Sequence, residues 1–150
     1  MAALGKAAVV WNGSLASGNG QFRFESGAGG DVPVTCALED RTPAGKSTPE
    51  ELLAAAHGSC FSMALAQVLV MSHHKPDHVR VAVTTTLEQV KKDSPYLITR
   101  EALEVSAKVP GLNKDGFLQM VEAAKSMCAV GLAIKGNVEI HYDVRLEPEA

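Results

Sequence analysis

The stretch TPEELLAAAHGSCFSMALAQVL, residues 48–69, predicts a long helix with a clear beginning. Thr48 is placed as the N-cap, Pro49 takes the first helical position, and Glu51 at the third completes a capping box. The helix is expected to run to about Met71, ahead of the polar stretch SHHKPDH. Because apolar side chains occur on every face of this helix, it must be covered on all sides.

Alternating and β-branched runs on either side of this helix predict strands. They are expected at residues 7–11, 21–25, 32–38, 79–90, 96–109 and 137–146. Asn113 is expected to cap a second helix, and a short apolar turn should follow Cys128. The order of strands, helix, strands, helix and strand indicates an α+β fold. The length predicts a single domain over residues 1–150.

The composition limits the partners of this chain. It is 46% hydrophobic and 21% charged, so it can build a core, and its formal net charge of −3 argues against nucleic acid or an anionic membrane as the main partner. Residues 52–71 approach the length of a membrane span, but their polar side chains favour a helix buried inside protein. Three cysteines without a visible export signal fit the reducing cytoplasm.

The apolar helix also predicts an oligomer. One sheet of five or six strands would cover only one side of it. A second subunit would supply the remaining cover, so we expect an intimate homodimer.

Cys60 lies inside this apolar helix, with Glu50 about three turns ahead of it. A buried thiolate needs a nearby cation and hydrogen-bond donors. Arg41, in the loop expected over residues 38–47, could fold over Cys60, and Glu50 could hold its guanidinium in place. Such an arrangement suits peroxide reduction, in which the thiolate becomes a sulfenic acid that a second thiol, such as Cys128, can trap.

Spacing alone leaves other interpretations open. His57 with Cys60, and the histidines of SHHKPDH, do not match a zinc pattern. A Cys60–His57 nucleophile pair is geometrically possible but lacks an acyl-transfer signature. Both helical cysteines can also be ordinary core residues.

Several segments resemble the OsmC/Ohr family of organic hydroperoxide reductases. The helix motif STPEELLAAAHGSCFSMALAQVL is similar to the family's cysteine-bearing helix, and AVVWNGSLASGNG, VPGLNKDGF and AAKSMCAVGLAIKGNVEI are similar to its other motifs in the same order. The resemblance spans nearly the whole chain. It implies antiparallel β-sheets wrapped around two central helices in an intertwined homodimer, with active sites at the interface.

The resemblance also implies roles for four residues. Cys60 matches the peroxidatic cysteine and Cys128 the resolving cysteine, which implies an intrasubunit disulfide between them. Glu50 matches the family's glutamate, and Arg41 matches the arginine of the OsmC branch, one residue closer to the glutamate than usual. Arg23 falls too late in the amino-terminal segment to match the arginine of the Ohr branch and is expected at the surface.

Two departures from the family pattern concern cysteines. The family's CPVS is CAVG here, with Ala129 and Gly131, and the loss of the proline loosens the turn after Cys128. Cys36 has no recognisable counterpart and is expected to be structural or incidental.

The resemblance implies a cytoplasmic, thiol-dependent peroxidase that reduces organic hydroperoxides, and more weakly hydrogen peroxide, to alcohols. It implies no metal, flavin or haem, and no nucleic-acid or membrane partner. Electrons would come from an external dithiol, with dihydrolipoamide as the expected donor. The alternatives are a non-catalytic protein of this family that binds a small apolar molecule and, less favoured, a cysteine hydrolase that uses His57.

Overall fold

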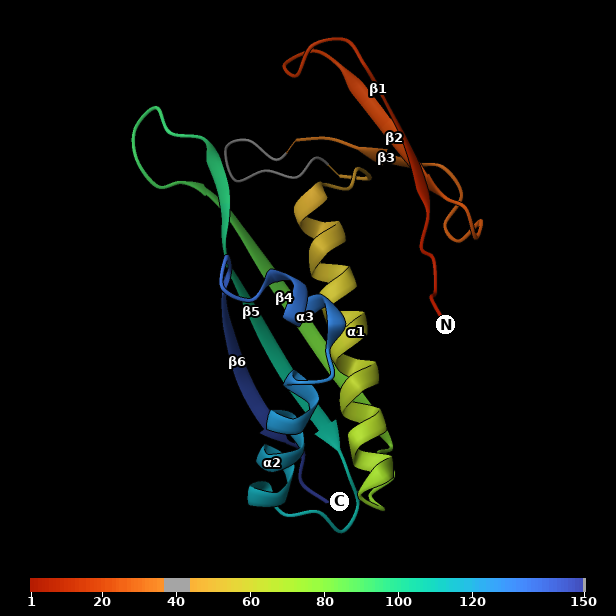
Figure 1. The fold of residues 1–150 in the computed structure, drawn as a ribbon, viewed down its shortest axis with the longest axis vertical. Coiled ribbons are helices and arrows are strands. Elements are labelled where there is room, and N and C mark those ends of the chain that lie inside the picture. The colour runs from red at the N-terminus through yellow and green to blue at the C-terminus, as the bar shows by residue number, and fades with distance from the viewer. Residues whose placement is uncertain (37–43, 150) are drawn as a thin grey trace. The chain divides into compact units, whose positions relative to one another are not determined.

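A computed structural model describes residues 1–36 and 44–149 (Figure 1). The chain divides into two compact units, Met1–Leu52 and Leu53–Ala150, and each unit has its own three-stranded sheet. The strands thus form two sheets, as the family resemblance implied, instead of the single sheet of five or six strands assumed when the cover of α1 was considered, and the α+β class is confirmed. The prediction of a single domain stays a prediction.

The first unit contains an antiparallel sheet in the order β1-β2-β3. Its strands are β1 (Ala7–Asn12), β2 (Asn19–Phe24) and β3 (Val32–Val34), so the first two predicted strands are confirmed and the third ends earlier than expected. Gly20 pairs with Trp11, and a Cβ at Gly20 would stand 2.6 Å from the Trp11 ring. Only glycine therefore leaves room for this ring against the sheet.

The long helix α1 (Pro49–Met71) begins and ends where its sequence predicts. The Glu51 N–H donates to Thr48 Oγ1 at 3.2 Å, and the Leu52 N–H donates to the Thr48 carbonyl at 3.1 Å. These bonds identify Thr48 as the N-cap, with Pro49 at the position where a missing N–H costs nothing.

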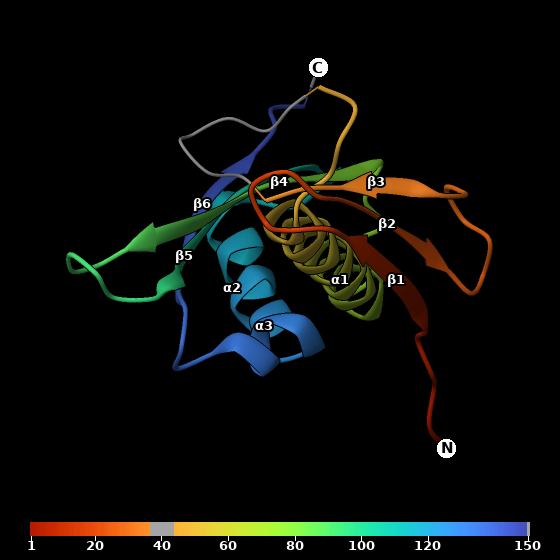
Figure 2. The same cartoon turned by 90° about the horizontal axis from the view of Figure 1, so that it is seen from above.

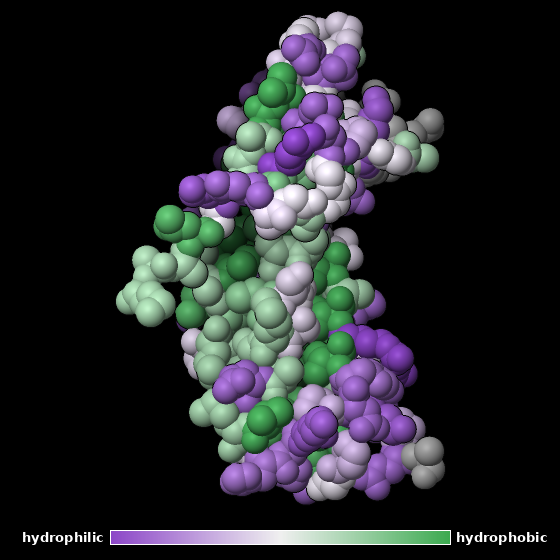
Figure 3. All heavy atoms as spheres, turned by 90° about the vertical axis from the view of Figure 1, so that its right-hand side faces the viewer, coloured by the Kyte–Doolittle hydropathy of each residue, from purple (hydrophilic) through white to green (hydrophobic). Residues whose placement is uncertain are grey.

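Within the second unit, one side of α1 is covered by the core. Its buried residues recur at helical spacing: His57, Phe61, Ala64, Leu65, Val68 and Leu69. Met63, Val70 and Met71 are exposed, and hydrophobic side chains gather over the uncovered side of the helix (Figure 3). By length and composition α1 could cross a membrane, a test that the core helix of a soluble protein also meets.

The second sheet has the order β4-β5-β6. β4 (His78–Gln89) pairs antiparallel with β5 (Tyr96–Lys108), whereas β6 (Glu139–Leu146) pairs parallel with β5. The expectation of wholly antiparallel sheets is thus wrong for β6, because the helical connection between β5 and β6 returns the chain in the same direction. Figure 2 shows the three helices on one side of this sheet.

Two helices connect β5 to β6. α2 (Lys114–Lys125) has Asn113 as its N-cap, because the Gly116 N–H donates to Asn113 Oδ1 at 2.8 Å, and this prediction is confirmed. α3 (Ala129–Ile134) stands where only an apolar turn was expected. The sequence of α3 lacks the usual oxygen-bearing N-cap, and Cys128 occupies that position instead.

The core of the second unit lies between this sheet and the helices. α2 contributes Phe117, Val121 and Ala124, which share one face, and β5 contributes every second residue of its carboxyl half. All are almost fully buried. The apolar residues of α2 and β5 therefore pack together with the buried side of α1 in one core.

Candidate functional site

Cys60 lies at the edge of the buried stripe of α1. His57, three residues earlier, and Phe61, the next residue, are both fully buried. Cys60 itself is half-buried and packs against the hydrophobic core of the second unit. A thiol in this position has apolar walls and keeps contact with solvent.

Cys128 is fully buried at the start of α3. Its Sγ accepts a hydrogen bond from the Gly131 N–H at 3.4 Å, so the sulfur itself acts as the helix cap. Burial raises the pKa of the Cys128 thiol, the Gly131 N–H lowers it, and the neighbouring Cys60 thiol raises it again. The net effect is upward, which keeps Cys128 protonated at neutral pH.

The structure brings Cys60 and Cys128 together, although they are far apart in the sequence. Cys60 packs against the hydrophobic core that contains Cys128, and the nearby Cys60 thiol helps to raise the pKa of Cys128. Both are free in this structure. Two free thiols that pack in one core can form a disulfide when one of them is oxidised.

Glu50 lies in the first turn of α1 and is half-buried. Its Oε2 atom is buried and has no hydrogen-bond partner among the residues that the structure describes. Arg41, the partner expected for it, lies outside the described residues. The expected Arg41–Glu50 pair therefore stays a prediction.

Arg23 forms an ion pair on the surface of the first unit. Its Nε and Nη2 donate to the two carboxylate oxygens of Asp31 at 2.7 and 2.8 Å. This pairing raises the pKa of Arg23 and lowers that of Asp31, while both side chains stay exposed. The expectation that Arg23 is a surface residue is confirmed.

A buried polar cluster adjoins the two cysteines, and most of it was not predicted from the sequence. His57 is fully buried, and its Nδ1 is paired with Glu101 Oε2 from β5. Thr85 on β4 donates to the other Glu101 oxygen at 2.7 Å. One signal was present in the sequence, because Glu101 alternates in phase with Leu103 and Val105, which marks it as an inward-facing residue of its strand.

The next two features are possible metal ligands and the third cysteine, Cys36. Within residues 1–36 and 44–149, no group of three or more His, Cys, Asp or Glu side chains is arranged to hold a metal ion. The expected absence of a metal or cofactor stays a prediction. Cys36 follows β3, is half-buried and is free.

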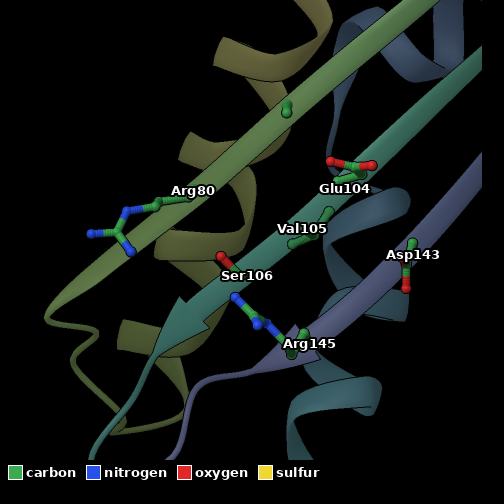
Figure 4. Close-up of a pocket in the computed structure, with 7 residues that line it drawn as sticks. Arg80, Glu104, Val105, Ser106, Asp143 and Arg145 are labelled. Atoms are coloured by element: carbon green, nitrogen blue, oxygen red, sulfur yellow. The ribbon is translucent and has the colours of Figure 1, made fainter.

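A hollow of about 420 Å³ opens on the outer face of the second sheet (Figure 4). Arg80 from β4, Glu104 and Ser106 from β5, and Asp143 and Arg145 from β6 line it. Charges of both signs mix there, and neither cysteine lines it. This hollow is therefore no part of the cysteine site.

A second hollow, of about 470 Å³, lies beside the cysteine site. Lys125 from α2, Gly131 from α3 and Tyr142 from β6 are among its lining residues. Lys125 Nζ stands 4.3 Å from the centre of the Tyr142 ring. Because the Gly131 N–H also contacts Cys128 Sγ, this hollow approaches the buried cysteine from the side of α3.

The chain is therefore a small α+β protein in which a cysteine on a helix lies near a second, buried cysteine. The family model described as OsmC-like protein matches residues 42–143. The chain belongs to this OsmC-like family, and the resemblance found in the sequence is confirmed.

Individual relatives agree with this assignment. Peroxiredoxin OsmC of Escherichia coli (strain K12) is 31% identical over 141 residues, which cover 93% of this chain and 96% of the relative. Organic hydroperoxide resistance protein-like 2 of Staphylococcus epidermidis is 28% identical over 98 residues, or 65% of this chain and 67% of the relative. The relatives of this chain therefore include proteins named peroxiredoxin and organic hydroperoxide resistance protein-like.

Solved structures show the same fold. The organic hydroperoxide resistance protein OsmC from Legionella pneumophila aligns with a TM-score of 0.72 at 22% identity, over 95% of this chain and 98% of its own. The OsmC like protein from Mycoplasma pneumoniae aligns with a TM-score of 0.78 at 11% identity, over 99% and 100%. At these identities the likeness concerns the fold alone.

Proposed function

We propose that this protein is a thiol-dependent peroxidase that reduces organic hydroperoxides to alcohols. The observation that carries the proposal is the half-buried Cys60 thiol beside the fully buried Cys128 thiol. Membership of a family whose relatives are named peroxiredoxin and organic hydroperoxide resistance protein supports it. The apolar residues around Cys60 favour organic peroxides over hydrogen peroxide.

The proposed catalytic cycle has three steps. The Cys60 thiolate attacks one peroxide oxygen, the O–O bond breaks, and the leaving alkoxide takes a proton to become an alcohol. Cys60 is then a sulfenic acid. The Cys128 thiol attacks the Cys60 sulfur and releases water, which leaves a Cys60–Cys128 disulfide. An external dithiol, such as dihydrolipoamide, reduces this disulfide by exchange and becomes a disulfide itself.

Arg41 and Glu50 are proposed to assist the first step. A guanidinium beside the peroxide would stabilise the charge that develops on the leaving oxygen. The buried Glu50 Oε2, which has no partner among the described residues, supports a role in holding that guanidinium. The protein would need no metal, flavin or haem, and a reducing cytoplasm would supply the dithiol.

Replacing Cys128 with serine should leave the first turnover intact and then inactivate the protein. Without the second thiol, the Cys60 sulfenic acid persists and is oxidised further to sulfinic acid by excess peroxide. Peroxide consumption should therefore stop after a few additions. Intact-protein mass spectrometry after each addition would measure this over-oxidation.

Cys36→Ser is the matched control, because Cys36 is a free, half-buried cysteine of the first unit. It should turn over repeatedly, and the wild type should show a Cys60–Cys128 peptide linkage after one equivalent of peroxide. A Cys36–Cys60 linkage with Cys128 still reduced would reverse these roles.

A second copy of this chain is proposed to cover the exposed side of α1. Met63 is 66% exposed in the single chain, and a glutamate there would cost little in a monomer but would be buried in a dimer. Met63→Glu should therefore shift the mass measured by light scattering from dimer to monomer. Val90→Glu changes a comparably exposed apolar residue in the β4–β5 hairpin and should leave the measured mass unchanged. A monomeric wild type would contradict the proposal.

A direct assay separates the candidate functions. The protein would be incubated with cumene hydroperoxide and dithiothreitol, and peroxide loss would be followed against a protein-free blank. Consumption supports the peroxidase. Its absence, together with saturable binding of the intact peroxide, would favour the non-catalytic binding protein, and hydrolysis of an activated ester that depends on Cys60 and His57 would favour the hydrolase.

A further inference from the structure

The buried His57–Glu101 pair has no role in the mechanism above. Both side chains are completely buried, and the Glu101 carboxylate is held by His57 Nδ1 on one oxygen and by Thr85 Oγ1 on the other. Burying two ionisable side chains is costly unless each is paired. A fully buried pair of this kind, placed one helical turn before Cys60, calls for a chemical explanation.

The second ring nitrogen of His57 and the Cys128 sulfur both lie beside Gly131. Its Nε2 atom is buried and has no hydrogen-bond partner among the residues that the structure describes. A Cβ at Gly131 would stand 3.0 Å from His57 Nε2 and 3.5 Å from Cys128 Sγ. Gly131 therefore leaves open a space that these two atoms share, and any larger residue would fill it.

The partners of His57 decide which nitrogen carries the proton. An ionised carboxylate only accepts hydrogen bonds, so the pairing with Glu101 places the imidazole proton on Nδ1. In this tautomer the ring lone pair is on Nε2, which lies beside the same glycine as Cys128 Sγ. This is the arrangement in which an imidazole can accept a proton from a neighbouring thiol.

Among the residues that the structure describes, few other groups near the His57–Glu101 pair could accept the Cys128 proton. Tyr142 on β6 packs against the same core, and burial, together with the charges of Cys128, Glu101 and Glu122, raises its pKa to about 12. It therefore keeps its proton at neutral pH. Cys60 on α1 is the sulfur under attack, and Glu101 is already engaged by His57 and Thr85.

We infer that His57, held in position by Glu101 and Thr85, carries the proton of Cys128 while the disulfide forms. This inference rests on the proposed peroxidase function and concerns only its second step. His57 Nε2 takes the proton from Cys128 Sγ, and the resulting thiolate attacks the Cys60 sulfenic sulfur. The S–O bond breaks, the new S–S bond forms, and the proton passes from His57 to the departing hydroxide to give water.

The raised pKa of Cys128 explains why such help is needed. A buried thiol that holds its proton at neutral pH is a poor nucleophile, because the thiolate is the reactive form. General-base assistance typically contributes about 100-fold or more to a step of this kind. Glu101 and Thr85 are positioning residues in this scheme, because they act only through His57.

The test separates the two chemical steps in the purified, fully reduced protein. One equivalent of cumene hydroperoxide would be added at several pH values between 6 and 9, with acid quenching at set times. Mass spectrometry would then count dimedone-trapped sulfenic acid and disulfide. In His57→Asn, the amide can still donate to Glu101, but nothing replaces Nε2.

His57→Asn should still form sulfenic acid but should form the disulfide about 100-fold more slowly than wild type at pH 7. The defect should shrink as the pH rises, because hydroxide then ionises Cys128 directly. Glu101→Gln should show a smaller defect of the same kind. A merely structural role for His57 would instead give a defect that does not change with pH.

Two further variants complete the test. His141→Asn is the matched control, because His141 forms an exposed pair with Glu139 at 2.5 Å on the outer face of the same sheet, and it should behave as wild type at every pH. Gly131→Ala places a methyl group 3.0 Å from Nε2 and 3.5 Å from Sγ and should reproduce the pH-dependent defect. If thermal unfolding shows that His57→Asn does not fold, the rate of disulfide formation in Gly131→Ala tests the proton transfer instead.

The outcomes distinguish this inference from the proposed function. Disulfide formation at the wild-type rate in a folded His57→Asn protein, or in Gly131→Ala where that variant decides, overturns the proton transfer and leaves the peroxidase intact. If the wild type forms no sulfenic acid and consumes no peroxide, the proposed function fails and this inference fails with it.

Discussion

Cys60→Ser protein should consume no cumene hydroperoxide above the protein-free blank. A serine hydroxyl is far less ionised than a thiol and cannot form a sulfenic acid, so neither the attack on the peroxide nor the disulfide step remains. The change is nearly isosteric, and Cys60 is only half-buried, so the fold should be preserved. Peroxide loss in the presence of dithiothreitol, measured beside thermal unfolding, would check both expectations.

Cys36→Ser again supplies the matched control, because it removes a free thiol of similar exposure elsewhere in the chain. It should retain wild-type turnover. Substantial peroxide consumption by a folded Cys60→Ser protein would remove Cys60 from the mechanism. Loss of turnover in Cys36→Ser instead would transfer the chemistry to the cysteine that the sequence indicates is incidental.

Arg41→Ala should slow the peroxide step by about 100-fold, the usual loss when one donor to a developing oxyanion is removed. Glu50→Ala should have a milder effect in the same direction, because the guanidinium would remain but lose the carboxylate that orients it. Single-turnover formation of the Cys60 sulfenic acid would measure this step without interference from disulfide formation or the external dithiol.

Arg23→Ala is the control for this assignment. The Arg23 side chain is exposed and engaged with Asp31, so its removal should leave the peroxide step unchanged. If Arg41→Ala reacts at the wild-type rate while Arg23→Ala is strongly impaired, the arginine of this site is Arg23. The shortened spacing between Arg41 and Glu50 would then explain the wrong assignment.

The elements that the sequence predicted well are those defined by short-range interactions. Thr48 begins α1 and Asn113 begins α2 through bonds to backbone groups three residues away, and such caps can be recognised within a few letters of sequence. α3 was not predicted, because it lacks such a recognisable cap. Its cap is a sulfur atom, which is not among the usual capping atoms, and its six residues carry too little periodicity.

The site was predicted only in part, because its members come from distant segments. The pairing of Cys60 with Cys128 came from the family resemblance, since spacing alone left both as possible core residues. Glu101 was overlooked because a single acidic residue in a strand is usually exposed. Its buried position depends on His57 and Thr85, which come from other elements.

The sequence by itself determined where α1 and α2 begin and which strands alternate, because these features depend on neighbours within one or two turns. It also determined which family the chain resembles, because that resemblance rests on a long and specific motif. Tertiary structure alone decided which strands pair in each sheet, that β6 runs parallel to β5, and which side of α1 the second unit buries. It also decided that His57 meets Glu101 beside Cys128. The reason is that strand pairing and buried polar contacts gain their free energy from residues distant in sequence, which no local pattern records.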